Sequence, residues 1–328
     1  MGKITNEIEE LVKKRQKLRS EKKYNESDKL RKIIKGKGYL IEDTAKGQKI
    51  KFRSRFSRLN RDSRDSKNSL IAIFGSGEMS PTGRKIHEYL IQDIAPSVKI
   101  ALLETPTGFE ANPHYWYERI AQMLQDGLQN YKPVITKVPA LRRDGPNSTN
   151  DPSVLKPLLE SDYIHTGAGS PSYAARHLKD TLAYEYLRNL SKKGTRISFA
   201  SATAIAFGKY LLPVYEIYKA GEDLHWKVGL DFFSQWGLNL TIIPHWNNTE
   251  GGKEIDTSRC YMGEKRIKRL LEILPGPTTI MGIDEQTACI FNLNKKEVLL
   301  MGVGGATIIK NSEEKIINPD SLFSFAIL

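Results

Sequence analysis

Ser201 is the first residue with the setting of a catalytic group. It lies between an apolar run and a run of small residues, in the stretch RISFASATAIAF. This pattern predicts a sharp turn from a strand into a helix, which exposes a serine hydroxyl above a sheet as a nucleophile. Phe199 and Thr203 occupy the positions that are glycine in Gly-x-Ser-x-Gly. A helix N-cap is the alternative role for Ser201.

A serine nucleophile needs a base that takes its proton, and histidine is the usual one. His245 follows the apolar run LTIIP and opens the polar loop PHWNNTEGG, so we expect it at the end of a strand. His165 precedes the glycines of HTGAGS and is the second candidate. The remaining histidines fall within or beside helix patterns or are ambiguous: His87, His114, His177 and His225.

An acid must orient the base, and the stretch MGIDEQTA offers Asp284 and Glu285 directly after another apolar run. An acid at the carboxyl end of a strand can reach a histidine in a neighbouring loop. The alternative is a turn acid that caps a backbone N–H group. The N–H of Ala202 and those of the loop GAGSPSY, near Ala168 and Gly169, are candidates for an oxyanion hole.

Other kinds of chemistry find less support in the sequence. The loop GSGEMSPTG resembles a dinucleotide-binding loop, but its third glycine is replaced by Ser80 and no acid follows at the usual distance. Histidines, cysteines and acids are not spaced like metal ligands. Cys260 lacks a strand-to-helix turn and ranks below Ser201 as a nucleophile, and Cys289 has a core pattern. We therefore expect neither cofactor nor metal.

The elements that must position these residues alternate between short apolar runs and helical patterns. This alternation predicts parallel βαβ units with helices on both faces of a sheet, and sites in such sheets form at the carboxyl ends of the strands. The last apolar runs, ACIFNL, EVLLMGV and ATIIKN, are expected to form an antiparallel edge of the same sheet. The runs assigned to the parallel part are LIAIF, KIALLE, VITKV, DYIHTG, RISFA, LTIIP and TTIMGI.

Positive charge is concentrated at one end of the chain. The 328 residues carry a net charge of +12, and residues 1–68 hold 22 Lys or Arg against 10 Asp or Glu. The rest of the chain is therefore neutral. A basic segment on a neutral body indicates a polyanionic partner, although a solvated helical surface is the alternative.

The sequence predicts two domains and a connection. Residues 1–55 are expected to form a small basic helical module, 56–68 a polar linker, and 69–328 an α/β domain. No run of about 18 apolar residues occurs, so we expect no membrane span. Two isolated cysteines favour a reducing, cytoplasmic location.

Residues 70–310 resemble the dipeptidase E and cyanophycinase family of serine peptidases. The resemblance rests on GSGE, GAGS, ASATA, PHWNN and GIDEQTA in the same chain order. It implies the class I glutamine-amidotransferase-like fold, a doubly wound, mostly parallel sheet. It also implies a Ser–His–Glu triad, which falls on Ser201, His245 and Glu285.

Residues 5–52 resemble the C-terminal tail of cysteinyl-tRNA synthetase. The spacing of YNESDKLR, GYLIEDT, a glycine and a basic-aromatic end carries this resemblance. The synthetase's catalytic core is missing, so the resemblance implies contact with RNA, and tRNA in particular, rather than aminoacylation.

Together these observations predict a serine hydrolase that acts on a small peptide, amide or ester and carries an RNA-binding module. Asn247, Asn248 and Arg259 lie in the loops expected to bind the substrate. The alternative is an inactive α/β scaffold attached to the RNA-binding tail. Cysteine-dependent amidotransfer is disfavoured because serine occupies the turn. The sequence leaves a homo-oligomer open.

Overall fold

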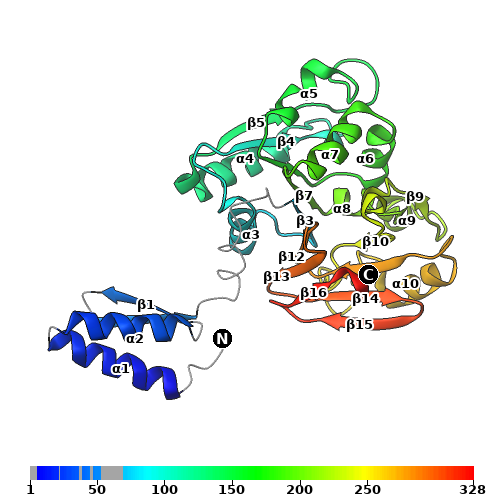
Figure 1. Cartoon of the computed structure of the whole chain (residues 1–328). Helices are drawn as coiled ribbons and strands as arrows, with labels where there is room; N and C mark the ends of the chain where they lie inside the picture. Colours follow the sequence, from blue (N-terminus) through cyan, green and yellow to red (C-terminus); the bar gives the residue numbers. More distant parts are fainter. Residues whose placement is uncertain (1–5, 22, 37–38, 45–46, 53–68) are drawn as a thin grey trace. The chain divides into compact units, whose positions relative to one another are not determined.

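A computed structural model describes residues 6–21, 23–36, 39–44, 47–52 and 69–328. The chain divides into two compact units, Met1–Ser66 and Lys67–Leu328, and each is described by itself (Figure 1). The predicted linker at 56–68 lies outside the described residues. Within the part of the chain that the structure describes, no helix has both the length and the apolar character to cross a bilayer.

The first unit contains two helices and a hairpin, α1 (Asn6–Ser20), α2 (Tyr24–Gly36), β1 (Tyr39–Thr44) and β2 (Gly47–Phe52). The two strands pair antiparallel, from Tyr39 opposite Phe52 to Thr44 opposite Gly47. Val12, Ile34 and Ile41 form a small buried core between helices and hairpin. A core of this size stabilises a fold weakly, so polar contacts matter in this unit.

The main polar contact of the first unit joins α1 to the hairpin. The Arg15 side chain is fully buried, and its guanidinium donates two hydrogen bonds to the Asp43 carboxylate, at 2.8 and 3.0 Å. These hydrogen bonds hold the pKa of Asp43 below its usual value. A guanidinium buried in this way needs its carboxylate, because an unpaired buried charge is costly.

We predict that Asp43→Asn destabilises the first unit by about 2–3 kcal/mol, because Arg15 then loses its counter-charge. Hydrogen exchange followed by mass spectrometry should show faster exchange in residues 6–52 and no change in the second unit. Since the folded pKa of Asp43 is lowered, its stabilisation should be present above the unfolded value near 3.8 and be lost as pH falls through the folded value. Asp28→Asn, an exposed change on α2, is the control; equal exchange in both variants would contradict the prediction.

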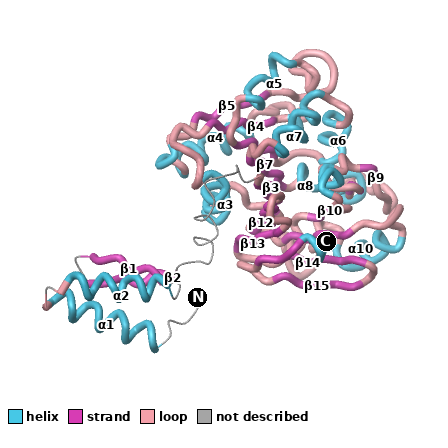
Figure 2. Tube along the Cα trace, viewed as in Figure 1, coloured by secondary structure: helices cyan, strands magenta, loops and turns pink. Residues whose placement is uncertain are grey.

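The second unit is built on an eight-stranded sheet with the order β16-β13-β12-β3-β7-β6-β4-β5 (Figures 1 and 2). The run β3-β7-β6-β4-β5 is parallel, whereas β12, β13 and β16 add antiparallel strands beside β3. The strands are β3 (Leu70–Phe74), β4 (Lys99–Leu103), β5 (Val134–Val138), β6 (Tyr163–Thr166), β7 (Arg196–Ala200), β12 (Thr287–Asn292), β13 (Glu297–Gly302) and β16 (Leu322–Ser324).

Helices cover both faces of this sheet, as the alternating pattern predicts. Figure 1 shows α3 (Pro81–Ile91) and α4 (Tyr115–Gly127) on one face. The opposite face carries α5 (Pro152–Leu159), α6 (Pro171–Leu178), α7 (Leu182–Lys192) and α8 (Ala202–Ala206). The histidines that the sequence places within or beside helix patterns lie there: His87 in α3, His114 directly before α4 and His177 in α6.

Two strands predicted for the main sheet lie elsewhere, and this corrects the sequence-based topology. LTIIP and TTIMGI form β10 (Leu240–Ile243) and β11 (Thr279–Ile283) of a separate four-stranded sheet. ATIIK forms β14 (Ala306–Lys310) of that second sheet, next to β15 (Glu313–Ile317), and not an edge of the main one. Of the three runs expected at the antiparallel edge, ACIFNL and EVLLMGV do join the main sheet, as β12 and β13. The strand β12 lies between β13 and β3 and is therefore internal.

The turn between β11 and β12 connects the second sheet to the main sheet. Only Asp284, Glu285 and Gln286 connect these strands, and Gln286 has a left-handed backbone with φ of 54°. The chain therefore leaves one sheet and enters the other within three residues. Further elements lie between α8 and β11 in the chain. The helix α9 (Val214–Tyr218) lies between the short strands β8 (Tyr210–Leu211) and β9 (Lys227–Val228), and α10 (Gly263–Glu272) follows β10.

Candidate active site

Ser201 lies at the junction between β7 and α8, as the sequence predicts. Its backbone has φ of 49° and ψ of −115°, a region that residues other than glycine rarely adopt. Strain of this kind costs about 1–3 kcal/mol and is found mostly at functional sites. The turn leaves the Ser201 side chain half-exposed above the carboxyl end of the sheet.

The two departures from the glycine pattern fit this turn. Phe199 is fully buried and stacks on Phe207 with ring centroids 3.9 Å apart, so its side chain points into the core and leaves the turn free. The Thr203 hydroxyl donates a hydrogen bond to the backbone carbonyl of Gly167 at 2.5 Å. That bond ties the first turn of α8 to the glycine loop after β6.

His245 contacts both neighbours that a catalytic base requires. Its Nε2 lies 3.0 Å from Ser201 Oγ, and its Nδ1 lies 2.7 Å from an Oε1 atom of Glu285. The residue follows β10 with φ of 51°, and its backbone N–H donates to the carbonyl of Gly75 at 2.8 Å. Gly75 directly follows β3, so this bond attaches the loop after β10, in the second sheet, to a central strand of the first.

Glu285, and not Asp284, faces the histidine. The hydrogen bond with His245 lowers the pKa of Glu285. Asp284 instead accepts a hydrogen bond from the N–H of Gly305 at 2.8 Å, and burial raises the pKa of its carboxyl group. The structure therefore distinguishes between two adjacent acids that local sequence leaves equivalent.

Asn247 and Asn248, predicted to bind the substrate, contact Glu285. The buried Asn248 amide donates to Glu285 Oε1 at 2.8 Å, and Asn247 Oδ1 accepts the backbone N–H of Glu285 at 2.8 Å. Both amides hold the acid in place, which is a positioning role the sequence analysis did not assign.

Arg259, the third predicted substrate-binding residue, packs on Trp246. Its guanidinium lies 4.3 Å from the ring centroid and donates to the Trp246 carbonyl at 3.1 Å. Arg259, Cys260 and Tyr261 all have left-handed backbones, and the N–H of Cys260 donates to the carbonyl of His245 at 3.1 Å. These hydrogen bonds attach the strained turn at 259–261 to His245 and Trp246.

A pocket of about 490 Å³ opens in front of Ser201. Its lining includes Ala202 and Gly169, two of the three residues predicted for an oxyanion hole, whereas Ala168 is half-buried in the adjoining loop. Gly169 has φ of 130°, and a Cβ atom there would overlap the carbonyl oxygen of Pro106. Cys260 also borders the pocket, but burial raises the pKa of its thiol, which disfavours a thiolate nucleophile.

Beneath the site lies a chain of buried hydrogen bonds that the sequence analysis missed. His87 Nε2 lies 3.1 Å from the carbonyl oxygen of Glu78, so it must carry the proton, and Nδ1 accepts from the Tyr163 hydroxyl at 2.6 Å. Ser198 then donates to Tyr163 at 2.6 Å and accepts from His165 Nδ1 at 2.7 Å. His165 Nε2 is left as a buried acceptor without a partner.

The Glu78 carboxyl group lies near this free acceptor. A Cβ atom on Gly167 would lie 3.1 Å from His165 Nε2 and 3.3 Å from Glu78 Oε1, so both atoms face the same space. Burial raises the pKa of Glu78, which favours the protonated form of its carboxyl group. His165, the second candidate for the base, therefore belongs to this buried chain and not to the pocket. In the sequence Glu78 appears only as an acid in a glycine loop.

Within the described residues, no group of three or more His, Cys, Asp or Glu side chains is arranged to hold a metal ion. The loop GSGE, which resembles a dinucleotide loop, instead supplies Gly75 to the histidine loop and Glu78 to the buried chain.

Comparison with known proteins supports the fold. No family profile matches the chain, and no curated protein sequence is similar to it. Among solved structures, a peptidase from an acI-B1 Actinobacterium superposes with a TM-score of 0.63 at 19% identity, covering 79% of this chain and 97% of that one. The second unit therefore has a peptidase-like α/β fold. A putative peptidase E protein from Listeria monocytogenes EGD-e matches with a TM-score of 0.45 at 12% identity, covering 76% and 98%.

The comparisons do not support the resemblance of residues 5–52 to the synthetase tail, which stays a prediction.

We predict that Glu78→Gln makes the protein less sensitive to rising pH. The folded pKa of Glu78 is raised, so its stabilisation is complete below the unfolded value near 4.5 and is lost as pH rises through the folded value. The free energy of unfolding of the wild type should therefore fall relative to that of Glu78→Gln across this range in urea titrations. Glu78→Ala removes the same titrating group, so its free energy of unfolding relative to the wild type should change with pH in the same direction. A difference between wild type and Glu78→Gln that does not change with pH would contradict a protonated Glu78.

Proposed function

We propose that the second unit is a serine hydrolase that cleaves an amide or ester bond through Ser201, His245 and Glu285. One observation carries the proposal: the hydrogen bonds Ser201–His245–Glu285 start from a serine on a strained strand-to-helix turn. A helix N-cap would not need a histidine within hydrogen-bond distance of its hydroxyl. An inactive scaffold would not need the two asparagines that hold Glu285.

The proposed reaction follows from the positions of these groups. Ser201 Oγ attacks the carbonyl carbon of the substrate while His245 Nε2 takes the hydroxyl proton. Glu285 stabilises the resulting imidazolium through Nδ1. His245 then gives the proton to the leaving amine or alcohol, which departs and leaves an acyl group on Ser201. A water molecule activated by the same histidine releases the acid and restores the serine.

The oxyanion formed during attack lies in front of Ala202 and Gly169 in this proposal. The N–H of Ala202 begins α8 next to the nucleophile, and Gly169 borders the same pocket from the loop after β6. The hydrogen bond from the Thr203 hydroxyl to the Gly167 carbonyl connects the start of α8 to the loop after β6. Donors fixed in this way need no rearrangement as charge develops, which is the main source of oxyanion stabilisation.

We predict that a fluorophosphonate probe labels Ser201, as identified by mass spectrometry of the digested protein. Ser201→Ala should lose the label, and His245→Ala should react at least about a thousandfold more slowly. Hydrolysis of p-nitrophenyl acetate should fall in parallel in both variants.

Ser234→Ala is the matched control, because Ser234 is an exposed serine outside the active-site pocket. Its labelling and hydrolysis should equal those of the wild type. A folded wild type that neither takes the label nor hydrolyses the ester would remove the hydrolase proposal.

We also propose that the first unit binds RNA, with tRNA as the favoured class. The support is the charge of +12 in residues 1–68 and the exposure of the cations on its helices. Polyanions bind such surfaces through release of counterions, so affinity depends strongly on salt. The exposed cations on α1 and α2 include Lys13, Lys14, Lys17, Lys29, Arg31 and Lys32.

We predict that Lys13→Glu/Lys17→Glu weakens binding of purified bulk tRNA, because two adjacent cations on one face of α1 become anions. The plot of log affinity against log salt should become less steep by about 1.8 if both lysines contact phosphates. Lys265→Glu/Lys268→Glu on α10 makes the same charge change in the second unit and serves as the control. Equal losses in both variants would contradict a specific role for the first unit.

A further inference from the structure

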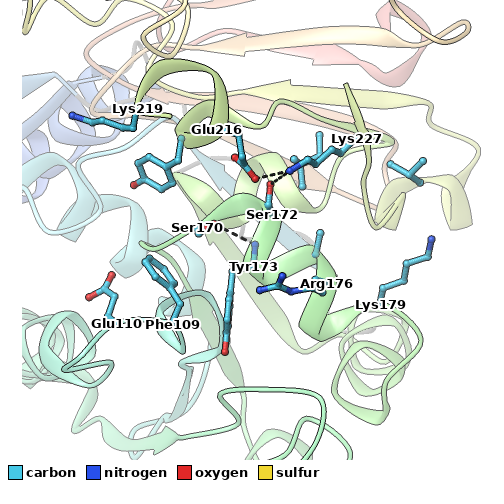
Figure 3. A pocket seen from close by; sticks show the side chains of 14 residues that line it. Phe109, Glu110, Ser170, Ser172, Tyr173, Arg176, Lys179, Glu216, Lys219 and Lys227 are labelled. Carbon is cyan, nitrogen blue, oxygen red and sulfur yellow. Dashed lines mark hydrogen bonds and ion pairs between the residues drawn. The ribbon is translucent and has the colours of Figure 1, made fainter. Parts of the chain in front are cut away.

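A second pocket, of about 820 Å³, opens beside the active-site pocket. The two share Tyr215 and Lys219 in their linings. They also meet along the start of α6, where Gly169 and Pro171 border the active-site pocket and Ser170 borders the second one. A molecule lying in the second pocket can therefore extend to Ser201. We call this second pocket the lateral groove; its residues are drawn in Figure 3.

The lateral groove has an excess of positive charge. Lys227 pairs with Glu216 at 2.6 Å, so these two charges neutralise each other within the groove. The remaining charged residues of the lining are three cations and a single acid, which leaves a net charge of +2. These residues are Arg176, Lys179, Lys219 and Glu110.

The three cations are spread along the groove rather than gathered at one point. Arg176 and Lys179 lie three residues apart on and just after α6, whereas Lys219 follows α9. In Figure 3 Lys219 and Lys179 lie toward opposite ends of the lining, with Arg176 between them. Cations at separate points of the lining can each contact a different anionic group of one chain-like ligand.

Two aromatic rings in the lining expose much of their surface. Phe109 is 52% exposed and Tyr215 is 45% exposed, although both border a pocket. Large apolar rings left exposed in a groove mark a binding surface. Stacked bases fill such surfaces in proteins that bind single-stranded nucleic acids, where a basic groove follows the phosphates.

We propose that the lateral groove binds the end of a single-stranded RNA and presents an acyl ester on that end to Ser201. The spaced cations would contact successive phosphates, and Phe109 and Tyr215 would stack on bases. An acidic peptide could use the cations, but it offers no flat rings for the aromatic residues. The identity of the scissile ester rests on the proposed hydrolase function, whereas the binding of RNA in the groove does not.

The test measures binding without catalysis, in the full-length Ser201→Ala protein. A fluorescein-labelled single-stranded RNA of about eight nucleotides is titrated by anisotropy between about 50 and 200 mM salt. Arg176→Ala/Lys219→Ala should bind at least about tenfold more weakly, with a salt dependence less steep by about 1.4. Phe109→Ala should weaken binding by about tenfold with the salt dependence unchanged.

Lys192→Ala/Lys193→Ala, at the exposed end of α7, removes two charges outside the groove and should bind like the parent protein. Equal loss in this control and in the groove variant would overturn the proposal, as would an unchanged salt dependence in the groove variant. A hexa-aspartate peptide that displaces the RNA at lower concentration than unlabelled RNA would assign the groove to acidic peptides instead. Groove binding by the Ser201→Ala protein, together with a folded wild type that neither takes the fluorophosphonate label nor hydrolyses p-nitrophenyl acetate, would remove the hydrolase proposal alone.

Discussion

The candidate active site depends on a backbone junction at Gly75. Its N–H donates to the Thr287 carbonyl at 2.9 Å, and its own carbonyl accepts the N–H of His245. Its Cα lies so close to the turn after β11 that any Cβ atom would overlap the carbonyl oxygens of Ile283 and Asp284. The loop that carries His245, the turn at residues 284–286 and the central strand β3 thus meet at a glycine. At this point the two sheets meet through backbone atoms, and a side chain at Gly75 would prevent the contact.

Several residues of the candidate site have strained backbone conformations, and hydrogen bonds from neighbouring segments stabilise the site. Ser201, His245 and the turn at 259–261 all have left-handed backbones. The Thr203 hydroxyl donates a hydrogen bond to Gly167, which connects the turn after β7 to the loop after β6. Asn247 and Asn248 form hydrogen bonds with Glu285. The groups that would react therefore have their geometry fixed before a substrate arrives, which is how preorganised sites lower a barrier.

The sequence predicts the positions of the site residues better than their surroundings. The structure brings Ser201, His245 and Glu285 together, and each comes after an apolar run, although the runs before His245 and Glu285 lie in the second sheet. The two-sheet topology was missed because β10 and β11 are apolar on both faces, and such runs do not encode which neighbour they pair with. The partners of Asn248 and Glu78 depend on contacts between segments far apart in the chain, which no local pattern contains. The resemblance selected Glu285 over Asp284, and local spacing alone does not.

The pairing of β12 with β3 has a consequence for the order in which the protein is made. β3 is among the first elements of the second unit to be synthesised, yet its antiparallel neighbour β12 and the adjacent Glu285 come near the end. A nascent chain on the ribosome has Ser201 and His245 long before it has the acid that orients them. Translation must pass Gln286 before the proposed relay is complete. The proposed base therefore lacks its orienting acid until late in synthesis, and a product of premature termination before β12 exposes one edge of β3 to aggregation.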